Sequence, residues 1–406
     1  MTNNKNKVAA VIGASSEAIY AINTAKELGF YTVALDGNPK AGGFEAADES
    51  IVVDIRDEEL VKKTLKPLSP LLVLPVPIGR YLTITGAVND SFGLTGVSYK
   101  AASNCTDKYL FHRLLSDKGL RNAILYLIPA NSQSFDEAIA KMSFPVIAKP
   151  RFGSGSRSVE MYSSFEELQK GFLDKLPIDE DFIVETCVEG HEYGVDGAFT
   201  DGKFNLILLR DKVNTPPPFC QCVGYYSVVE KDCDNDTKAF ITKLKHHLQS
   251  CGEILGLTNT LFHADIIRTG DNEPFVIELS ARPSGHNLHN LFTPAVTGVD
   301  IIREFIKLAV PSLENSKASF IPSNTKHMLI RYFDLPMGTV QKVPSEAELK
   351  GIPLHTYVCN IKPGDKIGKV TDGASIMGRG FYVIEASSRK ELDEYSTQVR
   401  NLFIVN

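Results

Sequence analysis

Acidic, imidazole and hydroxyl side chains are expected to share one face of a β-hairpin in the second half of the chain. Two β-rich runs, residues 261–268 and 275–280, flank a polar turn at 270–273. A turn centred between Asp271 and Asn272 gives three cross-strand pairs: Asp265 with Glu278, His263 with Ser280, and Ile267 with Val276. Alternation of side chains then places the apolar residues on the core face: Ala264, Ile266, Phe275, Ile277 and Leu279.

The opposed carboxylates of Asp265 and Glu278 indicate a divalent cation. Like charges directly opposite in a sheet are destabilising unless a positive charge lies between them. Oxygen ligands without thiolates favour Mg²⁺ or Mn²⁺, and one or two protein carboxylates are typical of magnesium that phosphate oxygens complete. The alternative is a solvated acidic pair on an exposed sheet face, and a register slip of one residue would separate the two side chains.

Basic residues and a glycine-containing loop could supply the rest of a phosphoryl-transfer site. Arg282 follows the hairpin by two residues, where a guanidinium can neutralise charge that develops on a phosphoryl oxygen. Lys149 ends an apolar strand at 145–149, and two glycines in the loop at 153–158 let backbone N–H groups approach phosphates. The loop is not a Walker A loop, because no Gly-Lys-Ser/Thr enters a helix. By itself it is more often a flexible surface turn.

The elements before this site alternate strands with helices. Strands are expected at 8–12, 31–35, 51–53 and 71–74, with one helix after Ser15 or Ser16 and another at 57–65. The βαβαβ order predicts a parallel open sheet.

A dinucleotide-dependent oxidoreductase is a weaker alternative for this first sheet. The turn Gly13-Ala14-Ser15 lacks the three-glycine fingerprint of dinucleotide-binding folds. Asp36, at the end of the second strand, could hold a ribose hydroxyl or simply form an Asp-Gly turn.

The composition indicates a soluble, globular chain of two to three domains. The 406 residues include 43 basic and 49 acidic side chains, and the net charge of -6 disfavours nucleic acid and anionic membranes as partners. No apolar run reaches about 18 residues, so no membrane span is expected. Seven scattered cysteines are typical of reduced thiols, which favours a cytoplasmic location.

The motifs resemble, in type and order, those of the ATP-grasp superfamily. The resemblance covers residues 105–300 and is carried by these segments: Cys105-Thr-Asp-Lys108, Phe144-Pro-Val-Ile-Ala-Lys149-Pro, Gly153-Ser-Gly-Ser-Arg157-Ser-Val159, Ile183-Val-Glu185, Val188-Glu-Gly190-His-Glu192-Tyr, His263-Ala-Asp265 and Val276-Ile-Glu278-Leu-Ser-Ala-Arg282-Pro. It implies a mixed α/β and α+β architecture in three parts. These are an N-terminal parallel α/β domain over 1–102, an ATP-grasp domain of two lobes over 103–320 with a hinge near 185–190, and a small C-terminal lid domain over 321–406.

The resemblance also implies a role for each matching residue. Residues that would hold ATP are Lys108, Lys149, Gly153, Ser154, Gly155, Ser156, Arg157, Ser158, Glu185, Thr186, Cys187, Val188, Glu192 and Lys212. Asp265 and Glu278 would bind Mg²⁺ or Mn²⁺, and Arg282 would be the catalytic residue that steadies an acyl phosphate. Many members have Glu at the first metal position and Asn two residues after the second. This chain has Asp265 and Ser280 there, which predicts a weaker hold on a second magnesium ion.

The activity that the resemblance implies is an ATP-dependent carboxylate–amine ligation. A carboxylate would be activated as an acyl phosphate, with release of ADP, and then joined to an amine such as an amino acid. The stretch 285–291 is most similar to L-amino-acid ligases and glycinamide-ribonucleotide-synthetase-like proteins. Candidate substrate contacts are His286, His289, Arg331 and Arg379. The alternative is a degenerate ATP-binding sensor or scaffold of the same fold. A homodimer is the default assembly.

Overall fold

The computed structural model describes residues 7–130, 137–153, 155, 158–173, 179–216, 221–313 and 317–406. Ser154, Ser156 and Arg157, which are predicted to contact phosphate, lie outside these residues. The described strands form four sheets, of four, eight, three and four strands. In these ranges no helix has both the length and the apolar character needed to cross a membrane.

The N-terminal sheet is parallel, as the alternating elements predict, and has the strand order β3-β2-β1-β4. Its strands are β1 (Val8–Ile12), β2 (Tyr31–Asp36), β3 (Glu49–Val52) and β4 (Leu72–Val73). The helices α1 (Ile19–Glu27), α2 (Glu58–Leu65) and α3 (Leu82–Phe92) follow its strands. All five residues of β1 are buried, as is typical of a parallel strand covered on both faces.

Asp36 is engaged by backbone groups of its own end of this sheet. One carboxylate oxygen accepts a hydrogen bond from the Ala14 N–H at 2.8 Å, and the other accepts one from the Asn38 N–H at 2.8 Å. The second bond is the local contact of an Asx-type turn. The geometry therefore agrees with the turn interpretation of Asp36.

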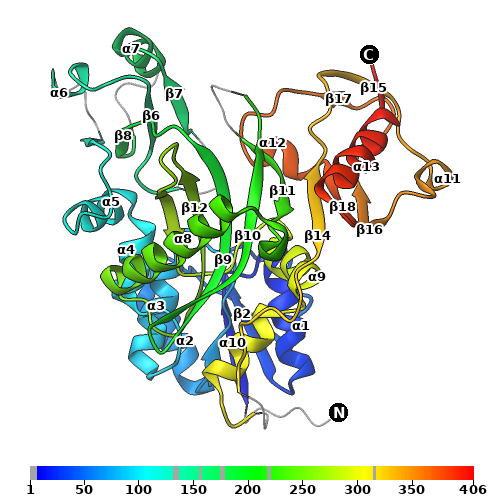
Figure 1. The fold of residues 1–406 in the computed structure, drawn as a ribbon. Helices are drawn as coiled ribbons and strands as arrows, with labels where there is room; N and C mark the ends of the chain where they lie inside the picture. The colour runs from blue at the N-terminus through cyan, green and yellow to red at the C-terminus, as the bar shows by residue number, and fades with distance from the viewer. Residues whose placement is uncertain are drawn as a thin grey trace.

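A small antiparallel sheet, at the upper left of Figure 1, has the order β5-β8-β6-β7. Its strands are β5 (Leu125–Ile128), β6 (Val146–Pro150), β7 (Glu160–Tyr162) and β8 (Phe182–Thr186), with α6 (Glu137–Ala140) and α7 (Phe165–Leu173) beside them. Pairing of β6 with β8 sets Lys149 opposite Ile183 and Ile147 opposite Glu185. Two segments that the sequence predicts to bind nucleotide thus become neighbours.

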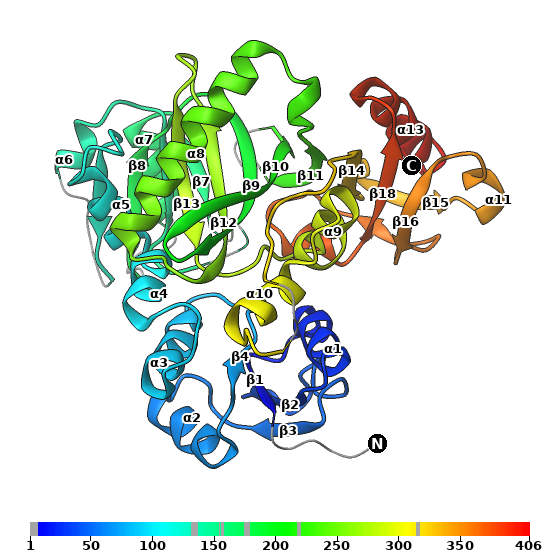
Figure 2. The ribbon, with the colours of Figure 1, turned by 60° about the horizontal axis from the view of Figure 1, so that its bottom comes forward.

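A large antiparallel sheet of eight strands forms the centre of the molecule, in the order β13-β12-β9-β10-β11-β14-β18-β16. Its first five strands are β9 (His191–Thr200), β10 (Lys203–Asn214), β11 (Cys222–Ser227), β12 (Thr260–Arg268) and β13 (Pro274–Ser280). The long helix α8 (Asn235–Leu255) covers one face of these strands (Figure 2). Its apolar stripe, which includes Leu244 and Leu248, shares a core with Phe199 and Phe262 of the sheet.

The C-terminal segment continues the same sheet. β14 (His327–Tyr332) pairs with β11, and β18 (Gly380–Ala386) and β16 (Leu354–Cys359) extend the sheet outward. A three-stranded sheet of β15 (Gly338–Lys342), β17 (Lys366–Ile367) and β19 (Ile404–Val405) lies beside it, with α11 (Glu346–Leu349), α12 (Ala374–Met377) and α13 (Arg389–Asn401). The sequence pattern did not indicate that the β11–β14 pairing joins these parts.

Helices connect the sheets and pack against the N-terminal part. α4 (Tyr99–Thr106) and α5 (Lys108–Ser116) lead into the small sheet, and α9 (Thr293–Thr297) and α10 (Ile301–Ala309) follow the hairpin. Three apolar residues of α10, Ile302, Phe305 and Ile306, share a core with α1 and β1. The chain therefore returns to the N-terminal sheet before it enters the C-terminal segment.

A glycine at the centre of the large sheet provides a test of this packing. A Cβ atom on Gly197 would lie 2.2 Å from the Phe262 ring and 2.7 Å from the Phe204 ring, whereas one on the exposed turn residue Gly270 would meet nothing within 4 Å. We expect Gly197→Ala to lower the free energy of unfolding by about 1–3 kcal/mol, because the core must shift. Urea denaturation measures the change. Equal stability of Gly197→Ala and Gly270→Ala would contradict the packing.

Candidate active site

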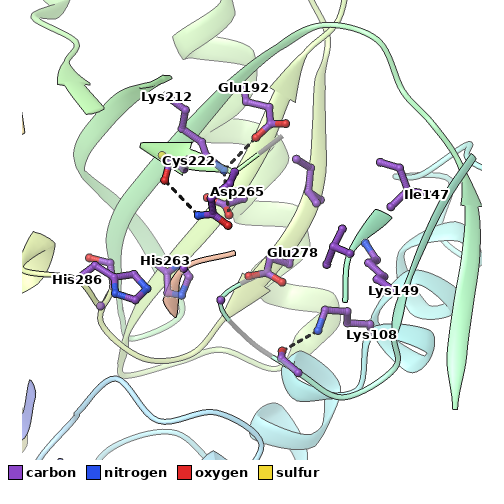
Figure 3. Close-up of a pocket in the computed structure, with 18 of the residues that line it drawn as sticks. Lys108, Ile147, Lys149, Glu192, Lys212, Cys222, His263, Asp265, Glu278 and His286 are labelled. Atoms are coloured by element: carbon purple, nitrogen blue, oxygen red, sulfur yellow. Dashed lines mark hydrogen bonds and ion pairs between the residues drawn. The ribbon is translucent and has the colours of Figure 1, made fainter. Parts of the chain in front are cut away.

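One pocket of about 380 Å³ is lined by both the small sheet and the large sheet (Figure 3). Its volume lies in the range of small-molecule sites. The structure brings most of the predicted site residues into its lining: Lys108, Lys149, Gly153, Gly155, Glu185, Thr186, Cys187, Val188, Glu192, Lys212, Asp265, Glu278, Arg282 and His286.

Four other predicted site residues are not in this lining. Ser158 precedes Val159, which lines the pocket, and its backbone is left-handed with φ of 57°. His289 is completely buried. Arg331 forms an ion pair with Asp334, and Arg379 donates hydrogen bonds to two backbone carbonyls of the C-terminal segment. Arg331 and Arg379 thus have partners away from the pocket lining, whereas His289 lies behind it, beside Glu17 and Ser284.

The hairpin of β12 and β13 has the predicted register at its chemically important end. Asp265 lies opposite Glu278, and His263 lies opposite Ser280. Both carboxylates line the pocket, and Figure 3 shows them at its centre. The pairing inferred from the turn is therefore confirmed at these two positions.

The register shifts by one residue directly after the opposed carboxylates, because Ile277 is an extra residue on β13. The predicted partner of Ile267 is therefore wrong: it pairs with Phe275 and not with Val276. A β-bulge redirects the side chains around it. As a result Phe275 and Ile277 line the pocket, although strict alternation had placed them on the core face.

Lys212 balances part of the acidic charge. It lies within β10, where its Nζ is 3.3 Å from an Asp265 oxygen and 3.0 Å from a Glu192 oxygen. Burial lowers the pKa of Lys212, but Asp265 and Glu192 together raise it well above its ordinary value. Burial raises the pKa of Asp265, and Glu278 raises it further while Lys212 opposes both. Burial and Glu278 thus outweigh the stabilisation that Lys212 gives to ionised Asp265.

The residues present fit a divalent cation. Two carboxylates lie directly opposite each other, and Glu278 helps to raise the pKa of Asp265 although Lys212 contacts Asp265. No group of three or more His, Cys, Asp or Glu residues able to hold a metal occurs in the described ranges. An ion bound by Asp265 and Glu278 would therefore complete its coordination with phosphate or water oxygens, as magnesium does.

A buried ionic network holds Lys149 on the small sheet. Both Lys149 and Arg121 form ion pairs with the Glu185 carboxylate, and the His112 ring lies 3.5 Å from it. Burial lowers the pKa of His112, and the neighbouring Lys149 lowers it further. Arg121 also donates to the Val276 carbonyl at 2.8 Å, so it ties the small sheet to β13. Sequence reasoning missed Arg121, because no motif surrounds it.

Lys108 is placed by the start of α5. Asp107 caps this helix by accepting from the Leu110 N–H, and the same carboxylate forms two hydrogen bonds with Arg151, just after β6. Lys108 Nζ donates to the Gly153 carbonyl at 2.8 Å. Burial lowers the pKa of Lys108, and Lys149 lowers it further while Glu278 opposes both. An anion between Lys108 and Lys149 would offset the cost of keeping both of them charged.

Polar residues that the sequence did not single out also line the pocket: Glu17, Glu160, Arg210, Gln221, Cys222, Tyr225, Ser284 and Tyr332. They come from several distant parts of the chain, so no single local pattern could have grouped them. In Figure 3, His263 and His286 lie to one side of the carboxylate pair, and Lys149 and Ile147 lie to the other.

Arg282 is half-buried in the wall of the pocket that holds the carboxylate pair. Burial lowers its guanidinium pKa, while Glu278, Glu17 and Asp265 oppose this change. One of its terminal nitrogens donates to the neighbouring Pro283 carbonyl at 2.8 Å, and its Nε has no hydrogen-bond partner in the described structure. It retains N–H groups for an anion in the pocket.

The comparisons with known proteins agree with this geometry. Residues 142–289 match the family model described as the ATP-grasp domain. The formate-dependent phosphoribosylglycinamide formyltransferase of Prochlorococcus marinus is 23% identical over 309 residues, covering 73% of this chain and 75% of that protein. The L-arginine-specific L-amino acid ligase of Bacillus subtilis is 23% identical over 311 residues, covering 74% and 72%. The D-alanine–D-alanine ligase of Clostridium botulinum is 23% identical over 264 residues, covering 62% and 82%.

Solved structures are similar over nearly the whole chain. The L-amino acid ligase of Bacillus licheniformis has a TM-score of 0.79 at 17% identity, covering 99% of this chain and 98% of that one. The phosphoribosylglycinamide synthetase of Anaerococcus prevotii has a TM-score of 0.71 at 21% identity, covering 98% and 99%. At these identities the likeness shows the fold alone, and it confirms the predicted fold class. The resemblance to the ATP-grasp superfamily is confirmed by the domain match over residues 142–289.

The raised pKa of Asp265 predicts a pH-dependent effect of its removal. A carboxyl whose folded-state pKa is raised loses stabilisation as the pH rises through that pKa. We therefore expect the unmodified chain, in EDTA, to lose more stability than Asp265→Asn as the pH rises from the ordinary carboxyl range toward neutral. Urea titrations across pH measure both slopes. Equal slopes for the two chains would contradict the interpretation.

Proposed function

Because residues 142–289 are an ATP-grasp domain, we propose that this chain is an ATP-dependent ligase. It would activate a small carboxylate as an acyl phosphate, releasing ADP, and join it to an amine to form an amide bond. The observation that carries this proposal is the opposed pair Asp265–Glu278, with Lys108 and Lys149 in the same pocket. The named ligases among its relatives support the same chemistry.

The lysines and the loop would bind the phosphates. Lys108 and Lys149 approach the pocket from α5 and β6, and Gly153 and Gly155 offer backbone close to both. The adenine would lie against the strand end at 185–188, with Ile147 and Met161 on the pocket wall. Glu192 would accept the ribose hydroxyls. Lys149 then bridges the phosphates and Glu185, which couples the two halves of the nucleotide site.

The carboxylate pair and Arg282 would act on the transferred phosphoryl group. Asp265 and Glu278 would hold magnesium, which would supply positive charge to neutralise the phosphate oxygens. Arg282 would steady the oxygens of the acyl phosphate and of the transition state that leads to it. Little covalent chemistry is asked of the side chains, because positioning and electrostatic stabilisation account for most phosphoryl transfer.

A nucleotide sensor without turnover is the second candidate, and no observation favours it. Such a protein would be expected to lack a metal carboxylate or the arginine. Asp265, Glu278 and Arg282 all line the pocket. Screening amino acids and small carboxylates against amines with Mg²⁺ and ATP, by phosphate release and product mass, separates the two functions.

Glu278→Gln tests the metal-binding role. The change keeps the shape of the side chain and removes its charge, so we expect the rate of ADP formation to fall by at least about 100-fold while the fold is retained. Glu273→Gln, in the exposed turn of the same hairpin and paired with Lys243, is the matched control. Coupled ADP assays and circular dichroism give the readouts. Full activity of Glu278→Gln would exclude it as a ligand.

Lys149→Ala tests the nucleotide site. Loss of one charge-assisted hydrogen bond to phosphate should weaken ATP binding by about 10- to 100-fold. Isothermal titration calorimetry with a non-hydrolysable ATP analogue and Mg²⁺ measures the affinity. The exposed Lys243→Ala is the control for charge alone. An unchanged affinity would remove Lys149 from the phosphate site.

A further inference from the structure

Arg210 is a buried arginine of β10 that lines the pocket and that no motif singled out. Its side chain is only 2% exposed. One terminal nitrogen, Nη2, donates to an Asp196 oxygen at 3.0 Å, and the guanidinium stacks over the Tyr225 ring at 4.9 Å. Its Nε and Nη1 have no hydrogen-bond partner in the described structure. Unsatisfied buried donors are costly, so their retention beside a cavity indicates a ligand that accepts hydrogen bonds.

The contacts of Arg210 fix it in place before any ligand arrives. Asp196 is 1% exposed, and its second oxygen accepts a hydrogen bond from the Thr293 hydroxyl. The carboxylate is thus held on both sides and orients the guanidinium. Burying such a pair without further contacts is costly, and replacement of both residues by neutral ones is often tolerated. Stability of the fold alone therefore does not account for a buried Arg210–Asp196 pair whose arginine has unsatisfied donors.

A glycine makes room for the guanidinium next to the carboxylate pair. Strand pairing aligns Glu278, Asp265, Gly194 and Arg210 in one row across four neighbouring strands. A Cβ atom on Gly194 would lie 3.2 Å from Arg210 Nη2 and 3.3 Å from the Tyr225 ring. The guanidinium therefore lies over Gly194, on the side of Asp265 opposite Glu278.

Other unpartnered polar groups surround the same end of the pocket. His263 is 9% exposed, and its Nε2 has no hydrogen-bond partner among the described residues. The hydroxyl of Ser284, which is 2% exposed, has none either. Both residues line the same pocket as Arg210 and Arg282.

Two arginines on opposite sides suit two anionic groups better than one. Arg282 follows the edge strand β13, and Arg210 lies three strands away on β10, about 14 Å across the sheet. In the proposed function, Arg282 and the metal pair serve the carboxylate that becomes phosphorylated. Arg210 then remains for a different anion on the substrate side.

We propose that Arg210, positioned by Asp196 and assisted by His263, binds a carboxylate of the acceptor substrate, so that the amine this enzyme ligates is an amino acid with its carboxylate free. This inference rests on the proposed ligase function. The free carboxylate would accept from Arg210 Nη1 or Nε and would not react. The amine would thereby be directed toward the acyl phosphate beside Asp265 and Glu278.

The test compares each acceptor amino acid that supports ligation with its α-amide, for example L-alanine with L-alaninamide and L-methionine with L-methioninamide. We expect the unmodified enzyme to prefer the acid. Arg210→Met should lower kcat/KM for the acid by about 10- to 100-fold, through KM, and change that for the amide little, so the preference disappears. Product mass and phosphate release are the readouts.

Two further variants keep the result interpretable. Arg268→Met is the matched control, because Arg268 also pairs with an aspartate, Asp236, and stacks over an aromatic ring, yet lies outside the pocket lining. If Arg210→Met does not fold, the double variant Asp196→Asn with Arg210→Met removes both buried charges and should show the same loss of preference. Circular dichroism verifies the fold.

The outcomes distinguish this inference from the proposed function. Absence of ADP formation with every acid and amine would overturn the ligase proposal, and this inference with it. Ligation in which acid and amide are equal, in which the acceptor carries no anionic group, or in which Arg210→Met retains the preference would overturn the role of Arg210 and leave the ligase proposal standing.

Discussion

Two carboxylates that face each other across a β-hairpin set the main constraint on this structure. Asp265 and Glu278 are opposed on neighbouring strands, where like charges repel. Lys212 relieves part of this repulsion, and its own burial is possible only because Asp265 and Glu192 lie beside it. The rest of the pocket supplies positive charge. Lys108, Lys149 and Arg282 line the same pocket as the carboxylate pair, which leaves a space that phosphate groups can fill.

The sequence predicted the local parts of this arrangement well. The parallel N-terminal sheet and the opposition of Asp265 and Glu278 both follow from short-range signals: alternation and turn residues. The bulge at Ile277 did not follow, because one extra residue in an apolar run leaves no mark on its composition. It nevertheless changes which apolar side chains face the ligand.

Long-range contacts account for what the sequence could not predict. Arg121 acts through Glu185, 64 positions away, and Arg210 through Asp196 on an adjacent strand. Neither arginine stands out in the sequence, because only the fold brings it next to its carboxylate partner. The domain limits at 102 and 320 remain predictions. The cores show α10 packed on the N-terminal sheet and β14 paired with β11, so contacts cross both limits.

The eight-stranded sheet divides the molecule into a rigid frame and a separate clamp. The eight strands, from β13 at one edge to β16 at the other, are joined by continuous backbone hydrogen bonds. The C-terminal part therefore cannot swing relative to the pocket floor unless the β11–β14 ladder breaks. The small sheet of β5 to β8 shares no strand with that frame. Relative movement around a bound nucleotide is therefore mechanically easiest at the small sheet, and the hydrogen bond from Arg121 to the Val276 carbonyl of β13 is one contact it would strain.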